Sequence, residues 1–245
     1  MVSDQLVKVL LTPVLLAQGR YARSVALSLP EAAGPRDGLT GDGPPLRLLV
    51  VGDSAAAGVG VANQREALLG QTVAALARSY TVAWQLIART GATTAGTLKY
   101  LEKTAPASFD VAVTSLGVND VTAGRALSTW LEQQQTLVHL LRTKFQARHI
   151  VLSGLPPVHK FPALPQPLRW YVGKQVRQFD QALYTWAQTQ SDCAYVNLNL
   201  DFDVSWLASD KFHPGAPIYQ EWGRATAQQI QSRIKSETIV QNSKQ

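Results

Sequence analysis

Residues 46–60 read Leu-Arg-Leu-Leu-Val-Val-Gly-Asp-Ser-Ala-Ala-Ala-Gly-Val-Gly. The first six of them are nearly all apolar, which predicts a strand covered on both faces, as in a parallel sheet. Gly52 ends this strand, and the small residues that follow leave room for a tight turn and for a reacting group. Because ligands of open α/β sheets bind beyond the carboxyl ends of the strands, we expect Ser54 to lie at a functional rim. Taken alone, the Gly-Asp-Ser turn is explained equally well as a helix N-cap.

The rest of the chain alternates between short apolar strands and helices with apolar residues three and four positions apart. Further strands are predicted at residues 81–88, 109–116, 149–152 and 194–198, and helices at residues 64–80, 93–103, 125–145, 171–187 and 218–234. This order predicts the α/β class, with a mainly parallel sheet of about five strands and helices on both faces. We place one catalytic domain at residues 46–236, after a helical and irregular extension at 1–45 and before a polar tail at 237–245.

Composition narrows the classes of function. The net charge is +6, but the basic residues are scattered singly along the sequence, so nucleic-acid binding is not expected. The single cysteine, Cys193, excludes an internal disulfide and is expected to be a small core residue beside a strand. With only four histidines, far apart in the sequence, no metal site is expected.

The apolar run at residues 6–17 allows two interpretations. We expect an amphipathic helix packed on the domain, and the alternative is a peripheral contact with a membrane or lipid, aided by Arg20 and Arg23. A signal peptide fits poorly, because Asp4 stands where basic residues should be and Lys8 and Pro13 interrupt the run. The run is too short to span a bilayer, so a cytoplasmic location is expected, with peripheral membrane association as the alternative.

Four short motifs lie in loops after predicted strands: Gly52-Asp53-Ser54, Gly91, Gly117-Val118-Asn119-Asp120 and Asp210-Lys211-Phe212-His213. A serine hydroxyl becomes a good nucleophile when an imidazole takes its proton and a carboxylate orients that imidazole. Ser54, His213 and Asp210 match these three roles. A tetrahedral oxyanion also needs donors already in place, and the backbone N–H groups of Ser54 and Gly91 and the side-chain amide of Asn119 are candidates.

A proline-rich segment, residues 155–168, leaves the carboxyl end of a predicted strand and should overhang the same rim. We expect it to form a rigid wall of a substrate pocket, with His159, Phe161 and Leu164 as candidate lining residues. Asp53, next to the serine, is a further candidate for the pocket. The alternative is a loop that only covers the core.

These motifs resemble the SGNH hydrolase superfamily, which includes the GDSL esterases and lipases. The family's serine, glycine, asparagine and histidine correspond to Ser54, Gly91, Asn119 and His213, and Ala55 stands where GDSL proteins usually have leucine. The resemblance implies a flavodoxin-like three-layer α/β/α sandwich. It also implies ester hydrolysis through an acyl-enzyme on Ser54, with no metal or organic cofactor. The expected partner is a small-molecule ester, with a short-chain acyl or an aryl ester favoured; the oligomeric state is not predicted.

Other functions fit parts of the sequence. The same acyl-enzyme could transfer its acyl group to an alcohol or sugar, or could serve lysophospholipid or thioester hydrolysis. A non-catalytic binding domain of the same fold is a further alternative. A dinucleotide-binding site is disfavoured, because Arg89 rather than an acidic residue ends the second strand. An α/β-hydrolase is disfavoured, because Ser54 lacks the Gly-x-Ser-x-Gly elbow.

Overall fold

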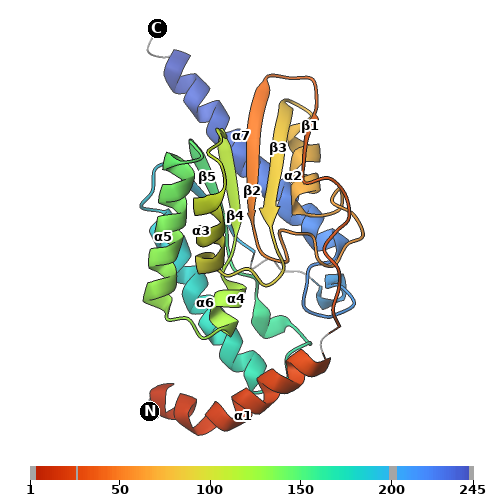
Figure 1. Cartoon of the computed structure of the whole chain (residues 1–245), viewed down its shortest axis with the longest axis vertical. Helices are drawn as coiled ribbons and strands as arrows, with labels where there is room; N and C mark the ends of the chain where they lie inside the picture. The colour runs from red at the N-terminus through yellow and green to blue at the C-terminus, as the bar shows by residue number, and fades with distance from the viewer. Residues whose placement is uncertain (1–3, 26, 199–202, 243–245) are drawn as a thin grey trace.

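A six-stranded sheet forms the centre of the protein in the computed structural model (Figure 1). The structure describes residues 4–25, 27–198 and 203–242, with side chains at 11–22, 24–25, 27–198 and 203–236. The strands are β1 (Asp37–Thr40), β2 (Pro45–Gly52), β3 (Thr81–Ala88), β4 (Val111–Ser115), β5 (His149–Ser153) and β6 (Cys193–Val196). Their spatial order is β1-β3-β2-β4-β5-β6, and all neighbours are parallel except β1 with β3. The five parallel strands therefore have the flavodoxin-like order, which confirms the predicted fold class.

The sixth strand, β1, was not expected from the sequence. It lies in a stretch rich in glycine, proline and aspartate, and all four of its residues are exposed. Among the described strands, its backbone pairs with β3 alone. A short, exposed edge strand carries little hydrophobic pattern, so nothing in its side chains distinguishes it from a loop.

Helices cover both faces of the sheet (Figure 1). The helices are α1 (Asp4–Val25), α2 (Leu68–Leu76), α3 (Thr94–Lys103), α4 (Val118–Thr122), α5 (Leu127–Thr143), α6 (Leu168–Ala187) and α7 (Ala216–Asn242), with 3₁₀ turns η1 (Val158–Lys160) and η2 (Val204–Trp206). Alternate β2 side chains enter the two cores: Leu49 and Val51 on the side of α3, α5 and α6, and Leu48 and Val50 on the side of α2 and α7. The apolar run is thus buried on both faces, as predicted for a central parallel strand.

Helices α2 and α7 differ most in length from their predictions. Helix α2 begins at Leu68 rather than residue 64, because the Gln64 side chain donates to the carbonyls of Ala32 and Ala57 and is held in the preceding loop. Helix α7 continues to Asn242 rather than ending near residue 234. No proline or glycine follows Gly223, so nothing in the sequence stops the helix within the expected tail.

The second half of the expected N-terminal extension is bonded closely to the sheet domain. Ala32 is buried, and its backbone N–H donates to the carbonyl of Ala57 in the loop after Ser54. Gln64 joins the same two segments through its side chain. Ala32 therefore ties this segment to the loop that carries Ser54.

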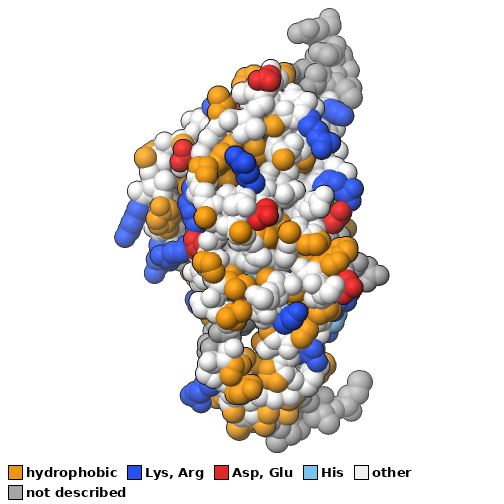
Figure 2. All heavy atoms as spheres, turned by 90° about the vertical axis from the view of Figure 1, so that its right-hand side faces the viewer, with side chains coloured by type: hydrophobic (Ala, Val, Ile, Leu, Met, Phe, Trp, Pro, Cys, Tyr) orange, Lys and Arg blue, Asp and Glu red, His pale blue; other side chains and the backbone are white. Residues whose placement is uncertain are grey.

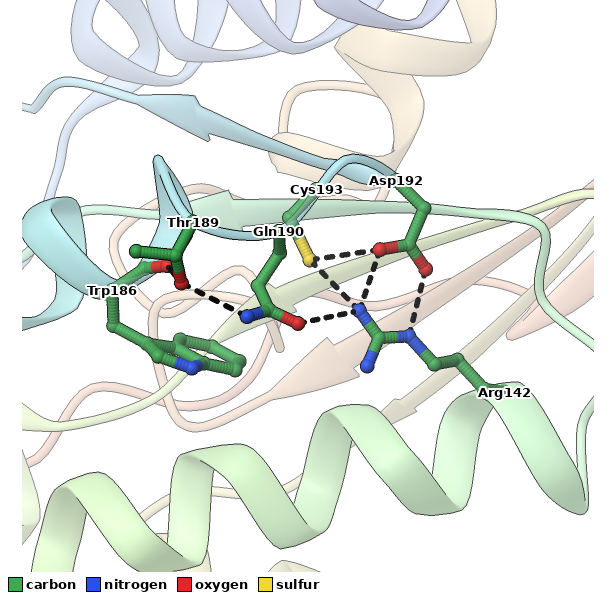
Figure 3. Close-up of polar contacts among 6 residues, drawn as sticks. All are labelled: Arg142, Trp186, Thr189, Gln190, Asp192 and Cys193. Carbon is green, nitrogen blue, oxygen red and sulfur yellow. Dashed lines mark hydrogen bonds and ion pairs between the residues drawn. The ribbon is translucent and has the colours of Figure 1, made fainter.

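Far from the Ser54 turn, an ion pair links the end of α5 to the start of β6 (Figure 3). The Arg142 guanidinium donates to both carboxylate oxygens of Asp192 and also to the Gln190 side chain. Cys193 lies against this pair, and burial raises the pKa of its thiol to about 11. A thiol with so high a pKa is a poor nucleophile, which fits the expected structural role of Cys193.

Helix α1 lies across the end of the molecule toward which the parallel strands run, and it packs on the start of α6 (Figure 1). Leu15 is buried there, and the Gln18 side chain both donates to the Gln166 carbonyl and accepts from the Leu168 N–H. The described part of α1 is thus a helix packed on the domain, as expected; the side chains of residues 6–10 lie outside the described residues. No helix in the described part of the chain is long and apolar enough to cross a membrane.

Candidate active site

The turn that carries Ser54 lies where the strand order reverses, between β2 and β4, which is where doubly wound sheets bind ligands. Gly52 is required there by close packing. A Cβ at this position would lie 2.4 Å from the Ala56 Cβ and 2.7 Å from the Ser115 carbonyl oxygen. The chain can therefore turn sharply after β2 only because residue 52 has no side chain.

Ser54, His213 and Asp210 form one continuous hydrogen-bonded chain. The Ser54 Oγ lies 2.9 Å from His213 Nε2, and His213 Nδ1 lies 2.5 Å from Asp210 Oδ2. The serine comes from the loop after β2, and the other two residues come from the loop before α7. The structure thus brings together the three side chains that the sequence predicted as a triad, across 159 residues of chain.

The Asp210 carboxylate is fixed by its own loop. Its Oδ1 accepts hydrogen bonds from the backbone N–H groups of Phe212 and His213, both at 3.0 Å, which leaves Oδ2 for the His213 ring. Burial on its own would raise the pKa of Asp210, but the hydrogen bonds from the His213 ring and from these two N–H groups outweigh it and lower the pKa. Asp210 is therefore an anion that accepts a hydrogen bond from the Nδ1–H group of His213, which leaves Nε2 free to take the proton of Ser54.

The three predicted oxyanion donors differ in whether they lie at the cavity beside the triad. No described residue accepts a hydrogen bond from the Ser54 backbone N–H. The Asn119 amide donates to the Ala92 carbonyl at 3.0 Å and makes a longer contact, 3.4 Å, with Asp53 Oδ2. Ser54 and Asn119 both line the cavity beside the triad, whereas Gly91 is exposed and absent from the described lining of that cavity. The oxyanion role of Gly91 stays a prediction.

Asp53 is buried beneath the triad. Its Oδ1 accepts from the Ala55 N–H and its Oδ2 faces the Asn119 amide. Burial, opposed in part by the Ala55 hydrogen bond and by His213, raises the pKa of Asp53 to about 6. The Asp120 carboxylate nearby adds to the rise. Asp53 therefore loses its proton as the pH rises from mildly acidic to neutral, and the resulting charge lies beside the Asn119 amide.

A mainly apolar cavity of about 70 Å³ opens beside the Ser54 hydroxyl. Its lining includes Phe161 and Asp53 from the candidate pocket residues and, beyond those predicted, Leu116, Leu155, Leu207, Phe212, Ile218 and Trp222. Phe161 meets Phe212 edge-on, with ring centroids 5.6 Å apart, and Phe212 is adjacent to His213. The proline-rich segment thus supplies a wall of the pocket through Phe161.

The other two residues predicted from that segment do not reach the described lining of the cavity. His159 lies over Gly173 of α6, and burial and then the nearby Arg177 and Lys160 lower its pKa. Leu164 packs on the core between the sheet and α6. An irregular segment has no regular period of side-chain directions. The sequence therefore could not indicate that Phe161, rather than His159 or Leu164, faces the cavity.

Sequence reasoning also missed Tyr219, on the first turn of α7. Its buried hydroxyl donates to the carbonyl of Ala55 at 2.9 Å and to that of Val59 at 2.7 Å. Both acceptors belong to the loop that follows Ser54, so Tyr219 ties this loop to the helix that follows His213. In the sequence, Tyr219 is an aromatic residue on the apolar side of a predicted helix. That position indicates a core residue and gives no sign of a role near Ser54.

Replacing Tyr219 with phenylalanine is expected to lower the free energy of unfolding by about 1–3 kcal/mol, because buried carbonyls lose their donor. Since the loop that carries Ser54 loosens, we also expect kcat for p-nitrophenyl acetate to fall several-fold with little change in KM. Tyr184→Phe, at an exposed tyrosine of α6, is the matched control. If kcat of the Tyr219 variant equalled that of the wild type, Tyr219 would have a role in stability alone.

Asp53 also makes stability depend on pH. Its pKa in the folded protein is about 6, above the roughly 3.9 of an unfolded aspartate, so the folded state binds the proton more tightly. This contribution to stability is full below about pH 4 and is lost as the pH rises through about 6. Relative to Asp53→Asn, the wild type should lose about 1–3 kcal/mol of unfolding free energy between pH 4 and 8.

Denaturant unfolding of the two proteins across this pH range measures the difference. Asp42→Asn, at an exposed loop position, controls for the removal of one carboxylate. A difference between wild type and Asp53→Asn that stays constant from pH 4 to 8 contradicts the raised pKa.

A serine, an imidazole and a carboxylate joined in this way, at the switch point of a doubly wound sheet, define the class of serine hydrolases. The chain belongs to the GDSL-like Lipase/Acylhydrolase family, whose model matches residues 50–221. It is therefore an ester hydrolase, and the resemblance noted in the sequence is confirmed. A search of curated protein sequences finds no match to the chain.

Several solved structures share the fold at low sequence identity. A member of the lipolytic protein G-D-S-L family from Veillonella parvula is 13% identical, with a TM-score of 0.59, over 76% of this chain and 98% of that one. The esterase EstA from Pseudoalteromonas is 16% identical, with a TM-score of 0.58, over 76% and 98% of the two chains. The acetylxylan esterase Axe2 from Geobacillus stearothermophilus is 16% identical, with a TM-score of 0.56, over 75% and 93%.

Proposed function

We propose that the protein hydrolyses esters of short-chain carboxylic acids through an acyl-enzyme on Ser54. The observation that carries this proposal is the unbroken hydrogen-bonded chain from the Ser54 hydroxyl through the His213 ring to the Asp210 carboxylate. Backbone N–H groups hold Asp210, and the Tyr219 hydroxyl holds the loop that follows Ser54, so the arrangement exists before a substrate arrives. Preorganisation of this kind is what lowers the barrier to acyl transfer.

The reaction proceeds in two halves. The Ser54 Oγ attacks the ester carbonyl carbon while His213 Nε2 takes the hydroxyl proton, and Asp210 stabilises the resulting imidazolium. The oxyanion accepts hydrogen bonds from the Ser54 backbone N–H and from the Asn119 amide, which gives up its long contact with Asp53. His213 then protonates the departing alcohol, and a water molecule, deprotonated by the same nitrogen, releases the acid from Ser54.

The cavity supports the choice of a short acyl group. Its volume of about 70 Å³ leaves space for only a few water-sized groups, since even one water needs at least roughly 10–15 Å³. Phe161, Leu155 and Trp222 are among its apolar walls. An acyl chain of two to four carbons would fill such a space. Axe2, by its name an acetylxylan esterase, acts on a short acyl group, and this likeness is consistent with the proposal.

Hydrolysis of p-nitrophenyl esters from acetate to palmitate tests this assignment. The wild type is expected to have its highest kcat/KM on acetate to butyrate. Phe161→Ala removes a wall of the cavity and should move the optimum toward longer chains, whereas Leu127→Ala, at an exposed position on α5, should leave it unchanged. A wild-type optimum at twelve carbons or more would contradict a short acyl pocket.

A further inference from the structure

Basic charge gathers at one end of the folded protein, although it is scattered in the sequence. Residues 5–30 and 158–179 contain seven basic residues and no acidic one: Lys8, Arg20 and Arg23, then Lys160, Arg169, Lys174 and Arg177. Their seven positive charges are more than the net charge of the whole chain, which is +6, so the rest of the chain carries no net positive charge. The two segments meet in space, because α1 packs on the start of α6. Five of the seven have described side chains (Arg20, Lys160, Arg169, Lys174 and Arg177), so basic charge is concentrated at this end of the described structure.

Apolar side chains are exposed at the same end. Leu16 and Tyr21 of α1 are 54% and 62% exposed, and Trp170 near the start of α6 is 43% exposed. Val14, Val25 and Leu27 are exposed there as well. Figure 2 shows hydrophobic side chains clustered at the lower end of the molecule, with basic side chains beside the cluster and no acidic side chain within it. We call this surface, formed by described residues of 11–27 and 158–177, the basic apolar cap.

We propose that the basic apolar cap docks the protein on the surface of an anionic lipid bilayer. A helix that buries one side against its own domain and presents aliphatic and aromatic residues flanked by cations lies in the interface of such a membrane. Anionic headgroups attract the cations, and the exposed leucine, valine and tyrosine side chains enter the boundary of the acyl chains. Nucleic acid fits less well, because Leu16, Val14 and Val25 offer it neither stacking nor hydrogen bonds.

The basic apolar cap lies at the same end of the molecule as the triad. The parallel strands run toward this end of the molecule, so the loops that carry Ser54 and Asn119 lie at the same end (Figure 1). Phe161, which walls the cavity, belongs to the segment between η1 and α6 that helps to form the cap. Docking would thus bring the cavity near the lipid surface, where apolar esters partition. The docking proposal itself does not depend on ester hydrolysis, because it is measured as binding.

The test is co-sedimentation of the full chain with vesicles of phosphatidylcholine alone or with 30% phosphatidylglycerol, a fraction of about one lipid in three chosen to give a strong surface potential. We expect binding to the anionic vesicles that weakens with salt, and little binding to the neutral ones. Leu16→Glu should reduce the partition coefficient tenfold or more, roughly the effect of losing an apolar anchor and adding a repelled charge. Leu39→Glu, on the exposed edge strand β1 and 69% exposed, is the matched control and should bind as the wild type does.

Charge is tested separately. Arg20→Gln with Lys174→Gln should weaken anionic binding about tenfold, whereas Arg65→Gln with Arg78→Gln, at exposed positions around α2, should not. Circular dichroism and thermal melting confirm that each variant is folded. Equal binding by Leu16→Glu and the wild type, or no binding to either kind of vesicle, overturns the proposal. Self-association that Leu16→Glu abolishes, without vesicle binding, would make the cap an interface between copies and likewise overturn it.

Discussion

Ser54→Ala is expected to lower kcat/KM for p-nitrophenyl acetate by about 10³-fold or more, because the acyl-enzyme can no longer form. The loss should leave the fold intact. The side chain contributes one hydrogen bond, to His213 Nε2, so the free energy of unfolding should change by about 1 kcal/mol or less. Steady-state hydrolysis and denaturant unfolding of the same preparation measure both quantities.

The three triad residues should act as one unit. Adding His213→Ala to Ser54→Ala is therefore expected to cause little further loss, although His213→Ala alone should cost about as much as Ser54→Ala. Ser79→Ala, at an exposed loop position after α2, is the matched control for the substitution itself. Residual activity of one tenth or more in Ser54→Ala would point to another nucleophile.

Asp210→Asn is expected to lower kcat by about 10³–10⁴-fold, because it changes which ring nitrogen of His213 carries the proton. The two backbone N–H groups that hold Oδ1 keep the asparagine carbonyl in place, so its NH₂ group must face His213 Nδ1. Nδ1 then becomes an acceptor and Nε2 carries the proton. In that state the imidazole donates to Ser54 instead of accepting its proton, and the serine is no longer activated.

Asp203→Asn provides a closely matched control. Asp203 also accepts a backbone N–H in its own loop, that of Ser205, but it does not contact His213. We expect its variant to retain full kcat. Titration of Ser54 with a phosphonate should be correspondingly slow in Asp210→Asn, since the same proton transfer limits both reactions. An Asp210→Asn variant with wild-type kcat would contradict the role of the carboxylate.

The sequence predicted the parts of the site that follow buried strands. Because the run before Gly52 and the run before Gly117 are apolar and contain β-branched residues, both could be identified as buried parallel strands, and their loops as parts of one rim. The pairing of Asp210 with His213 followed from their separation of three residues. These predictions rest on local patterns, and the geometry of the triad agrees with them.

The remaining features depend on contacts that no local pattern encodes. Tyr219 looks like an ordinary core aromatic until its hydroxyl is seen to meet two loop carbonyls from a turn about 160 residues earlier. The basic apolar cap arises because α1 packs on α6, which joins two segments far apart in sequence. For this reason, the judgement that the basic residues are scattered holds for the sequence but not for the folded surface.

The most direct test of the account is covalent labelling of the intact protein with an alkyl p-nitrophenyl phosphonate, which forms a stable analogue of the tetrahedral intermediate. We expect the mass to rise by one phosphonyl group per chain, with the adduct located on Ser54 by peptide mapping. The Ser54→Ala variant should remain unlabelled under the same conditions. An adduct on any other residue, or a folded wild-type protein that stays unmodified, would contradict the claim that Ser54 is the activated nucleophile.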